Sequence, residues 1–182
     1  MTTGFLREVS RGLRALLLLG LLAGCRSAVE KETVLLNCSF EEFEGWSQPI
    51  PTMLSTEKAH SGRYSYCVKQ GDDFAGNYHT SLSDCPEPPT MMRLDGWTYL
   101  PNVPIGATIL VLEVHCHGRR PDVWKGIGID QVVRRYEKWE HFTKTFRMPN
   151  DLLPSDEVKL YAWCPERGPT KYFDDLKLVA WR

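Results

Sequence analysis

Short segments of alternating apolar and polar residues recur along the chain. In the clearest one, at 107–117, every second residue from position 110 is apolar: Leu110, Leu112, Val114 and Cys116. The segments 62–70, 91–100 and 157–164 show the same period of two. Alternation over about four to eight residues is typical of a β-strand with one face in a core. The sequence therefore predicts strands at these positions.

The segment WEHFTKTFRMP at 139–149 alternates less regularly. Phe142 and Phe146 lie on either side of Lys144, so one face of a regular strand would mix apolar and charged side chains. An extra residue in one strand of an antiparallel pair changes the alternation locally. We therefore predict a β-bulge in this segment.

The C-terminal segment KYFDDLKLVAW places Asp174 on the same strand face as Leu176 and Leu178. Phe173 and Val179 lie on the other face, so alternation alone leaves the orientation of this strand open. We expect Asp174 to point inward with the two leucines. Burying an ionised carboxylate without a partner costs several kcal/mol, so Asp174 then needs a set of hydrogen bonds, a basic partner or a metal ion.

Proline-rich connections at 84–91 (DCPEPPTM) and 147–156 (RMPNDLLPSD) separate the predicted strands. No long stretch keeps a helical period between capping residues, and no repeat or linker marks a second domain. Short strands with turn signals between them are typical of a sandwich or barrel. We predict an all-β fold, a single antiparallel β-sandwich.

The start of the chain has a different pattern. Three arginines within the first 14 residues precede an apolar run at 15–23, which is followed by Gly24 and Cys25. A basic start and an apolar run of about 7–15 residues are features of a secretory signal peptide. The run is too short to span a bilayer, which needs about 20 residues.

The ending LLAGC resembles the lipobox of bacterial lipoproteins, in which the cysteine is lipidated and the peptide bond before it is cleaved. The resemblance implies a signal peptide at 1–24, a palmitate-bearing Cys25, a short tether at 25–33 and a domain at 34–182. The eight residues after the cysteine reach about 28 Å when fully extended. Arg26 follows the cysteine where an Asp would favour the inner membrane, so we expect the outer membrane. An ordinary secretory signal with an incidental cysteine is the alternative.

Composition excludes some classes of function. The formal net charge is −1 and no basic cluster occurs, which argues against nucleic-acid binding. Six Trp, seven Tyr and seven Phe exclude a disordered chain. Five cysteines follow Cys25, so at least one thiol stays unpaired even in an oxidising compartment. The sequence does not decide whether one disulfide forms or none. No CxxC occurs, so there is no redox or zinc signature.

Several sequence blocks, taken in order, resemble one group of domains. Between about 34 and 179 the chain contains NCSFEEFEGW, AHSGRYSYCV, LDGWTY, WEHFTKTFRMP, VKLYAWC and YFDDLKL. Together they are similar to carbohydrate-binding modules of the 4/9/22-like group, which are galactose-binding-like jelly rolls. The resemblance implies a jelly-roll sandwich and places Trp46 and Trp139 in its framework. Likeness of fold alone does not establish function.

Domains of this kind often hold a structural calcium ion near the edge of the sandwich. The resemblance implies that Asp174 and Glu41 are metal ligands and that backbone carbonyls at 58–61 help to complete a shell of about six to eight oxygens. Glu42 and Glu44 compete with Glu41 for this role. In the alternative, Asp174 accepts backbone N–H groups or pairs with an arginine, and no metal is bound.

The strand faces opposite the predicted core combine aromatic and polar side chains. Sugars present apolar C–H faces and a rim of hydroxyls, so aromatic rings beside carboxylate, imidazole and guanidinium groups suit them. In the resembled modules an open sheet face plays this part. The predicted carbohydrate-binding residues are Trp97, Tyr99, Tyr161, Trp163, Arg93, Asp95, Glu113 and His115. In the alternative, loops cover these rings as a second small core, and Trp124 is either a lid or a loop anchor.

The sequence offers little support for catalysis. His115 and His117 share a strand face while Cys116 points to the other, so a regular strand cannot direct all three at one zinc ion. Asp95 and Glu113 are a candidate carboxylate pair, but glycoside hydrolysis needs a defined separation between them. No G-x-S-x-G or H-E-x-x-H occurs. We predict that the protein is not an enzyme.

The combined prediction is a lipid-anchored, non-catalytic carbohydrate-binding protein of the bacterial cell envelope. Its partners would be a poly- or oligosaccharide and, through the N-terminal lipid, the membrane. The alternative is a structural or adaptor lipoprotein that uses the same jelly roll to dock an envelope protein.

Overall fold

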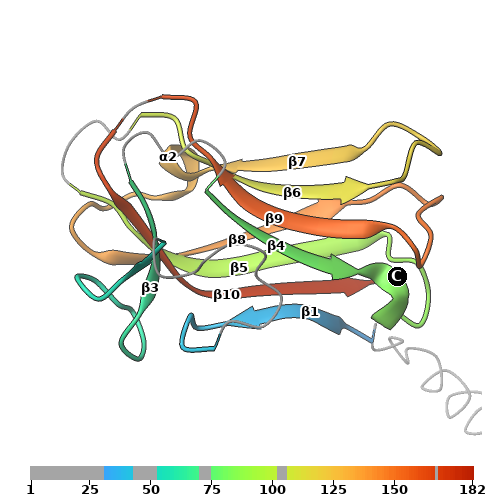
Figure 1. Ribbon diagram of the computed structural model, residues 1–182, viewed down its shortest axis with the longest axis horizontal. Coiled ribbons are helices and arrows are strands. Elements are labelled where there is room, and N and C mark those ends of the chain that lie inside the picture. Colours follow the sequence, from blue (N-terminus) through green and yellow to red (C-terminus); the bar gives the residue numbers. More distant parts are fainter. Residues whose placement is uncertain (1–30, 43–52, 70–74, 102–105, 167) are drawn as a thin grey trace, which may run out of the picture. The chain divides into compact units, whose positions relative to one another are not determined.

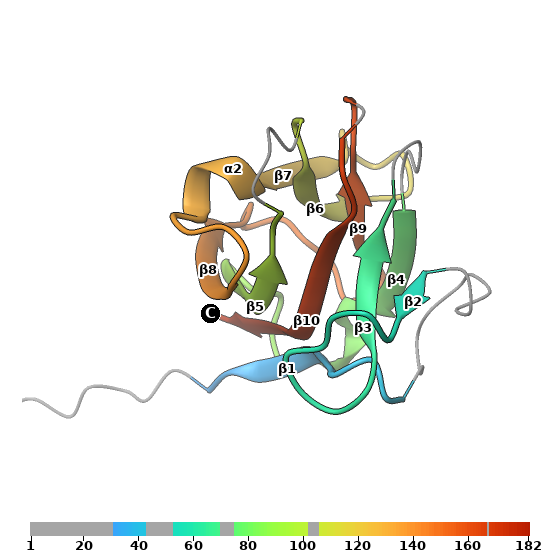
Figure 2. The ribbon, with the colours of Figure 1, turned by 90° about the vertical axis from the view of Figure 1, so that its left-hand side faces the viewer.

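Two antiparallel β-sheets stack on each other in the computed structural model, which describes residues 31–42, 53–69, 75–101, 106–166 and 168–182 (Figure 1). Sheet A contains β1 (Thr33–Cys38), β2 (Leu54–Ser55), β3 (Ser65–Val68), β5 (Met91–Tyr99), β8 (Trp139–Arg147) and β10 (Lys171–Trp181). Sheet B contains β4 (Ala75–Ser81), β6 (Ile109–His115), β7 (Val123–Gly128) and β9 (Glu157–Trp163). Figure 2 shows β7, β6 and β9 above β8, β5 and β10. The prediction of a single antiparallel β-sandwich is confirmed.

The strand order places β10 and β5 in the middle of sheet A and β9 and β6 in the middle of sheet B. In sheet A, β10 pairs with β5 on one side and with both β3 and β1 on the other, and β5 then pairs with the edge strand β8. In sheet B the order is β4, β9, β6, β7. Within the described ranges, the connections contain two short helices, η2 (Leu82–Asp84) and α2 (Ile129–Val132).

The predicted apolar faces of the strands form the core between the sheets. Its fully buried members from β5, β6 and β9 include Met92, Leu94, Leu110, Leu112, Val114, Val158, Leu160 and Ala162. Gly96 occupies a core-facing position of β5 where a Cβ would come within 2.5 Å of Leu176 and 2.8 Å of Phe142. Two core side chains therefore fill the space that any larger residue would need.

β10 contains a bulge that the sequence did not reveal. Its register with β5 shifts between Asp174 and Lys177, and Asp175 between them has a φ of 48°, in the left-handed region. One extra residue in a strand inverts the alternation that follows it. Before the bulge, an odd-numbered residue, Phe173, points into the core. After the bulge, the even-numbered residues Leu176, Leu178 and Ala180 do so.

As a result, Phe173 and Leu176 both belong to the core, whereas Asp174 is paired with Trp97 on the outer face of sheet A. The prediction that Asp174 points inward with Leu176 and Leu178 is wrong, because the bulge separates them. Asp174 is nevertheless fully buried, so its need for partners remains.

β8 has no bulge. It pairs with β5 in one unbroken register from Trp139 to Arg147, and both Phe142 and Phe146 are buried in the core. Lys144 between them is exposed. Because β8 is an edge strand, a long lysine side chain can reach solvent from the core side of the sheet. The predicted bulge in 139–149 is therefore wrong.

The cysteines of the described residues are all buried: Cys38, Cys67, Cys85, Cys116 and Cys164. None of the five forms a disulfide, which decides between the two alternatives left open by the sequence. The signal peptide, the lipobox and Trp46 lie outside the described residues. Within the ranges that the structure describes, no helix is long and apolar enough to cross a membrane.

Candidate functional site

The eight predicted carbohydrate-binding residues lie on two different sheets. Those of β5 point outward from sheet A: Arg93, Asp95, Trp97 and Tyr99. Those of β6 and β9 point outward from sheet B: Glu113, His115, Tyr161 and Trp163. The outer faces of two stacked sheets point in opposite directions, so one glycan cannot contact both groups. The prediction of one shared platform is wrong, because alternation along a strand does not say which sheet the strand joins.

The same separation removes the candidate pair of catalytic carboxylates. Asp95 is on sheet A and Glu113 on sheet B, with the core between them. Two carboxylates that act on one glycosidic bond must lie on either side of it, within about 10 Å of each other. This pair therefore cannot perform glycoside hydrolysis.

On sheet A, the aromatic rings of β5 are covered by the turn at 57–64. The His60 ring stacks on Trp97 with ring centres 3.9 Å apart and an angle of 14° between the planes. Lys58 places its Nζ 4.8 Å from the centre of the Tyr99 ring. The Tyr172 hydroxyl donates to Glu57 from the same turn. For Trp97 and Tyr99 the structure therefore supports the alternative in which the rings form a covered second core.

The polar residues of β5 are also committed to contacts within the protein. Arg93 donates to Asp95 at 2.9 Å and to Glu32 at 2.9 Å, and its guanidinium lies 5.7 Å from the ring centre of Trp181. The hydrogen bond to Asp95, then the one to Glu32, raises the pKa of Arg93. These contacts connect the start of the described chain to its end.

Three carboxylates hold the 57–64 turn on sheet A. Asp174 Oδ2 accepts the backbone N–H groups of His60 at 2.7 Å and Ser61 at 3.2 Å, and Asp174 Oδ1 accepts the N–H of Asp175 at 2.8 Å. Asp175 contacts the His60 ring and the Ser61 hydroxyl, both at 2.6 Å. Burial raises the pKa of Asp174, and the three N–H groups act in the opposite direction.

Glu41 completes this arrangement from the other end of the turn. Its Oε1 accepts the N–H groups of Arg63 at 2.8 Å and Tyr64 at 2.7 Å. A Cβ on Gly62 would come within 2.6 Å of Glu41 Oε1, and Gly62 has a φ of 56°. Glycine is therefore needed here both for the backbone conformation and for the close approach of the carboxylate.

Calcium binding at Asp174 and Glu41 stays a prediction. The resemblance implied that carbonyl oxygens of the turn would join the two carboxylates around an ion. Instead, N–H groups of the turn donate to both carboxylates, and the Lys58 carbonyl accepts the Ser65 hydroxyl. Within the described residues, no group of three side chains could hold a metal ion. This set of contacts fits hydrogen bonding better than a calcium shell of about six to eight oxygens.

On sheet B, three aromatic rings lie together on the outer face. Trp124 on β7 is 47% exposed, and its ring centre lies 5.9 Å from that of Trp163 on β9 at an angle of 83°. Tyr161 lies two residues before Trp163 on the same side of β9. Val111 is paired with both Tyr161 and Gly126 and points to this side, yet it is fully buried.

Polar contacts join Tyr161 and Lys159 of β9 to Glu113 of β6. The Tyr161 hydroxyl donates to Glu113 Oε2 at 2.8 Å. Lys159 Nζ lies 3.7 Å from Glu113 Oε1. Burial, followed by the bond to Glu113, raises the pKa of Tyr161 to about 12. The ring of Trp124 packs against Trp163 and lies over Gly126, while much of it stays exposed.

Polar residues continue along the same face. His115 on β6 is opposite Glu157 on β9, and its Nδ1 lies 2.8 Å from Asp122 Oδ2. Asp122 Oδ1 also accepts the N–H of Cys116 at 2.8 Å. The hydrogen bond from the Cys116 N–H has the larger effect and the contact with His115 the smaller, and both lower the pKa of Asp122. We call this surface the sheet-B face, formed by Trp124, Tyr161, Trp163, Glu113, Lys159, His79, His115, Glu157 and Asp122.

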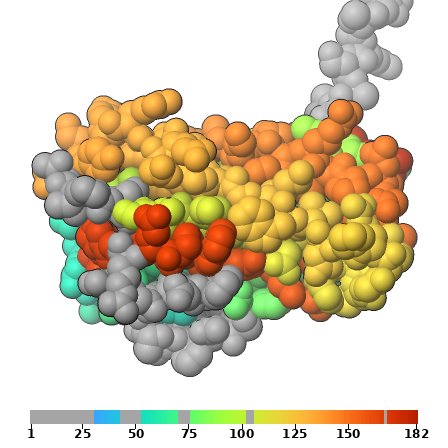
Figure 3. All heavy atoms as spheres, turned by 90° about the horizontal axis from the view of Figure 1, so that it is seen from above, coloured from blue at the N-terminus to red at the C-terminus, as the bar shows by residue number. Residues whose placement is uncertain are grey.

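The sheet-B face is an extended surface rather than a small pocket. From Trp163 to Glu157 the outward positions of β9 span about 20 Å at the usual rise of a strand. Figure 3 looks down on this side of the molecule, with the yellow β6–β7 segment beside the orange-red β9 segment. Aromatic rings occupy one end, and carboxylate, ammonium and imidazole groups the other.

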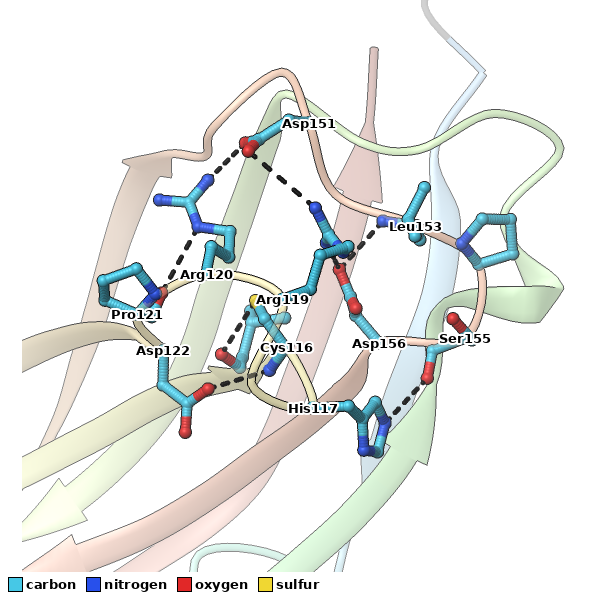
Figure 4. Close-up of polar contacts among 12 residues, drawn as sticks. Cys116, His117, Arg119, Arg120, Pro121, Asp122, Asp151, Leu153, Ser155 and Asp156 are labelled. Carbon is cyan, nitrogen blue, oxygen red and sulfur yellow. Dashed lines mark hydrogen bonds and ion pairs between the residues drawn. The ribbon is translucent and has the colours of Figure 1, made fainter.

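The polar end is bordered by two connected loops, shown in Figure 4. Arg119 of the β6–β7 loop donates at 2.7 Å to Asp156, a carboxylate that is 1% exposed and also accepts the N–H of Leu153. Arg120 pairs with Asp151. The β6–β7 loop, which carries Asp122, is therefore fixed to the connection between β8 and β9.

Sequence reasoning did not assign Trp124 to the site. The sequence RRPDVWKGIG looked like a loop, whereas Trp124 is in β7 at the edge of sheet B. The one available signal was Gly126, two residues further on and so on the same face. A Cβ there would come within 3.1 Å of the Trp124 ring. Lys159, the partner of Glu113, was also missed, because nothing in the sequence pairs these two strands.

No family model matches the sequence, and no curated protein matches it. Solved structures do match. The CBM22-1–CBM22-2 tandem domain of Xyn10C from Paenibacillus barcinonensis has a TM-score of 0.57 at 16% identity, over 86% of this chain and 48% of that one. The chain thus spans about half of the tandem structure.

Two single domains are similar over nearly their whole length. The CBM22-1 xylan-binding domain of the same Xyn10C has a TM-score of 0.54 at 16% identity, over 85% of this chain and 99% of that one. A xylan-binding domain from CBM22 has a TM-score of 0.55 at 12% identity, over 85% and 96%. The protein therefore has the galactose-binding-like fold of carbohydrate-binding modules, as the sequence blocks predicted.

Proposed function

We propose that this protein binds a glycan without catalysis and that the glycan lies on the sheet-B face. The observation that carries the proposal is the exposed ring of Trp124, which lies beside Trp163 at one end of a row of polar side chains. The fold supports it, because the similar solved structures are carbohydrate-binding modules, two of them described as xylan-binding.

The chemistry of this face suits an oligosaccharide. An exposed indole gives an apolar surface for the C–H face of a sugar ring, and fixing it in advance reduces the entropy lost on binding. Glu113 and Glu157 can accept hydrogen bonds from hydroxyls, and Lys159 can donate to them. A span of about 20 Å along β9 leaves room for several sugar units in a row.

We further propose that the protein is a lipoprotein of the cell envelope, anchored at Cys25 and located in the outer membrane. The basic start, the apolar run and the LLAGC ending support this proposal. Mass spectrometry of protein expressed in a bacterium tests it. A diacylated or triacylated Cys25 at the N-terminus is expected, and an unmodified cysteine there would contradict it.

Binding is tested by screening the purified protein against plant, algal and cell-wall glycans, followed by calorimetry on the best binder. Trp124→Ala should reduce affinity at least about tenfold, because a central aromatic contact of this kind is worth about 2 kcal/mol. Tyr136→Ala is the matched control, since Tyr136 is 46% exposed and lies between α2 and β8, outside sheet B. It should bind like the wild type.

The proposal fails if no glycan binds, or if Trp124→Ala binds as well as the wild type. The adaptor alternative would then gain support from a specific envelope protein recovered with the wild type. Hydrolysis of any bound glycan during prolonged incubation would contradict the non-catalytic part of the proposal alone.

A further inference from the structure

The charged side chains of the sheet-B face are mainly acidic. Three carboxylates point to this side, namely Glu113 from β6, Glu157 from β9 and Asp122 just before β7, against one ammonium group, Lys159. Lys125, the other lysine of these strands, is opposite the core residue Leu112 and so leaves β7 on the other side. Within the described residues the face therefore carries more negative than positive charge.

The one ammonium group is not available to balance an anionic ligand. Lys159 lies 3.7 Å from Glu113, so those two charges largely offset each other. Glu157 and Asp122 remain, in one row across the sheet with His115 between them. Neighbouring strands are about 5 Å apart, so an anionic group bound over this row would lie within one Debye length of both carboxylates at moderate salt.

The arginines next to the polar end do not reverse this charge. Figure 4 shows the guanidinium groups of Arg119 and Arg120 directed at Asp156 and Asp151 rather than at Asp122. Asp156 is almost completely buried, so the loss of Arg119 would leave a buried carboxylate without its charged partner, which is costly. The loop thus adds no free cation to the face.

We propose that the sheet-B face selects an uncharged glycan and discriminates against glycans that carry carboxylate or sulfate groups. This inference rests on the glycan-binding function proposed above. Hydroxyl groups can donate to Glu157 and Asp122, and hydrogen bonds to an ionised acceptor are stronger than neutral ones. A carboxylate or sulfate at the same place would lose water and meet only like charge.

The test uses pairs of polymers with one backbone and different charge: arabinoxylan with glucuronoxylan, and hydroxyethyl cellulose with carboxymethyl cellulose. Affinity is measured at pH 8, where imidazole is ordinarily uncharged, in 20 mM and 500 mM NaCl. The neutral member of any pair that binds should bind several-fold more tightly at low salt. The difference should narrow at high salt, because salt screens repulsion between exposed charges.

A charge variant identifies the source of the discrimination. Glu157→Gln should raise the affinity ratio of the anionic over the neutral member about twofold, the size expected for one exposed charge at close range. Glu137→Gln is the matched control, because Glu137 is exposed and lies between α2 and β8. It should leave the ratio unchanged.

The results separate this inference from the function on which it rests. An anionic polymer that binds as tightly as its neutral partner at low salt, or more tightly, overturns the inference and leaves glycan binding intact. A ratio that Glu157→Gln does not change overturns it as well. If neither member of any pair binds and the wider glycan screen is also negative, the proposed function itself is contradicted.

Discussion

At the scale of single residues, the exposed indole of Trp124 depends on a glycine two positions further along β7. Gly126 leaves space in which the edge of the indole lies over the strand, with Ile109 on the other side of the gap. A methyl group at Gly126 would come within 2.7 Å of Ile109 and 3.1 Å of the Trp124 ring. The φ angle of Gly126 lies outside the left-handed region, so an alanine there would change this contact without straining the backbone.

We expect Gly126→Ala to weaken glycan binding while leaving the fold intact. The added methyl group should tilt the Trp124 ring and cost roughly three- to tenfold in affinity, since a ring contact contributes about 1 kcal/mol. Calorimetry measures the affinity, and a thermal melt checks that stability is nearly unchanged. Wild-type affinity in this variant would show that the position of the ring is not set by the glycine.

A second residue-scale prediction concerns Asp122. Hydrogen bonds from Cys116 and His115 lower its pKa below 3.8, so the ionised form stabilises the folded protein. This stabilisation is fully present above the unfolded-state pKa of about 3.9 and is lost as the pH falls through the lower folded-state value. Urea unfolding of the wild type and Asp122→Asn should therefore differ most at pH 5–7 and converge toward pH 2–3. A difference that stays constant over this range would contradict the prediction.

At the scale of elements, the 57–64 turn determines what sheet A can do. It lies over the rings of β5 because carboxylates from β10 and from Glu41 accept its N–H groups. The bulge at Asp175 makes this arrangement possible, since it directs Asp174 outward to the turn while Leu176 stays in the core. The sequence motif DD in the last strand is thus an anchor for a covering turn.

We expect Asp174→Asn to lower the free energy of unfolding by about 1–3 kcal/mol. Both oxygens of Asp174 accept N–H groups, so an amide would place its own NH₂ against one of those donors. Thermal melts measure the change, and hydrogen exchange at His60 and Ser61 should speed up. Asp130→Asn, an exposed position in α2, is the control and should behave like the wild type.

The same melts test calcium. If the N–H groups alone hold the turn, adding EDTA or calcium leaves the wild-type melting temperature unchanged. A melting temperature that rises with calcium in the wild type, and not in Asp174→Asn, would instead establish the calcium site that the sequence resemblance implied.

At the scale of the whole molecule, the two outer faces of the sandwich differ in how their aromatic rings are used: those of β5 are covered, whereas sheet B presents an exposed ring. On sheet A the 57–64 turn covers the rings of Trp97 and Tyr99, whereas sheet B presents Trp124 and the row of polar groups beside it. The core between them contains the thiols of Cys38, Cys85, Cys116 and Cys164, and Cys67 is buried on the other face of β3; no disulfide joins any of them, although the chain carries a predicted export signal. Burial therefore shields all five thiols from solvent, and no disulfide among them stabilises the described residues.

This state of the cysteines leads to a prediction for the folded protein. The thiolate is the reactive form, and burial raises the pKa of Cys85 and Cys116. Iodoacetamide should modify none of the five in the native protein at pH 7.5 and all of them in guanidinium chloride, as peptide mapping would show. A disulfide-linked pair among them, isolated without reductant, would contradict this view of the core.

Strand alternation alone determined a large part of this fold. The core faces of β5, β6 and β9 follow directly from which residues are apolar at every second position, because a strand must bury its apolar side. Ordered sequence blocks were enough to indicate the galactose-binding-like sandwich. The choice of aromatic and polar residues for the outer faces was also readable, and Tyr161, Trp163, Glu113 and His115 do lie together.

Only the tertiary structure decided how those faces are used. Strand pairing is non-local, so the sequence could not show that β5 joins one sheet while β6 and β9 join the other, and the predicted platform divided in two. A single extra residue in β10 reversed the side to which Asp174 points. The 57–64 turn then covered Trp97, while β7 brought Trp124 beside Trp163. Local patterns identify which side chains avoid water, whereas long-range packing determines which of the remaining ones can meet a ligand.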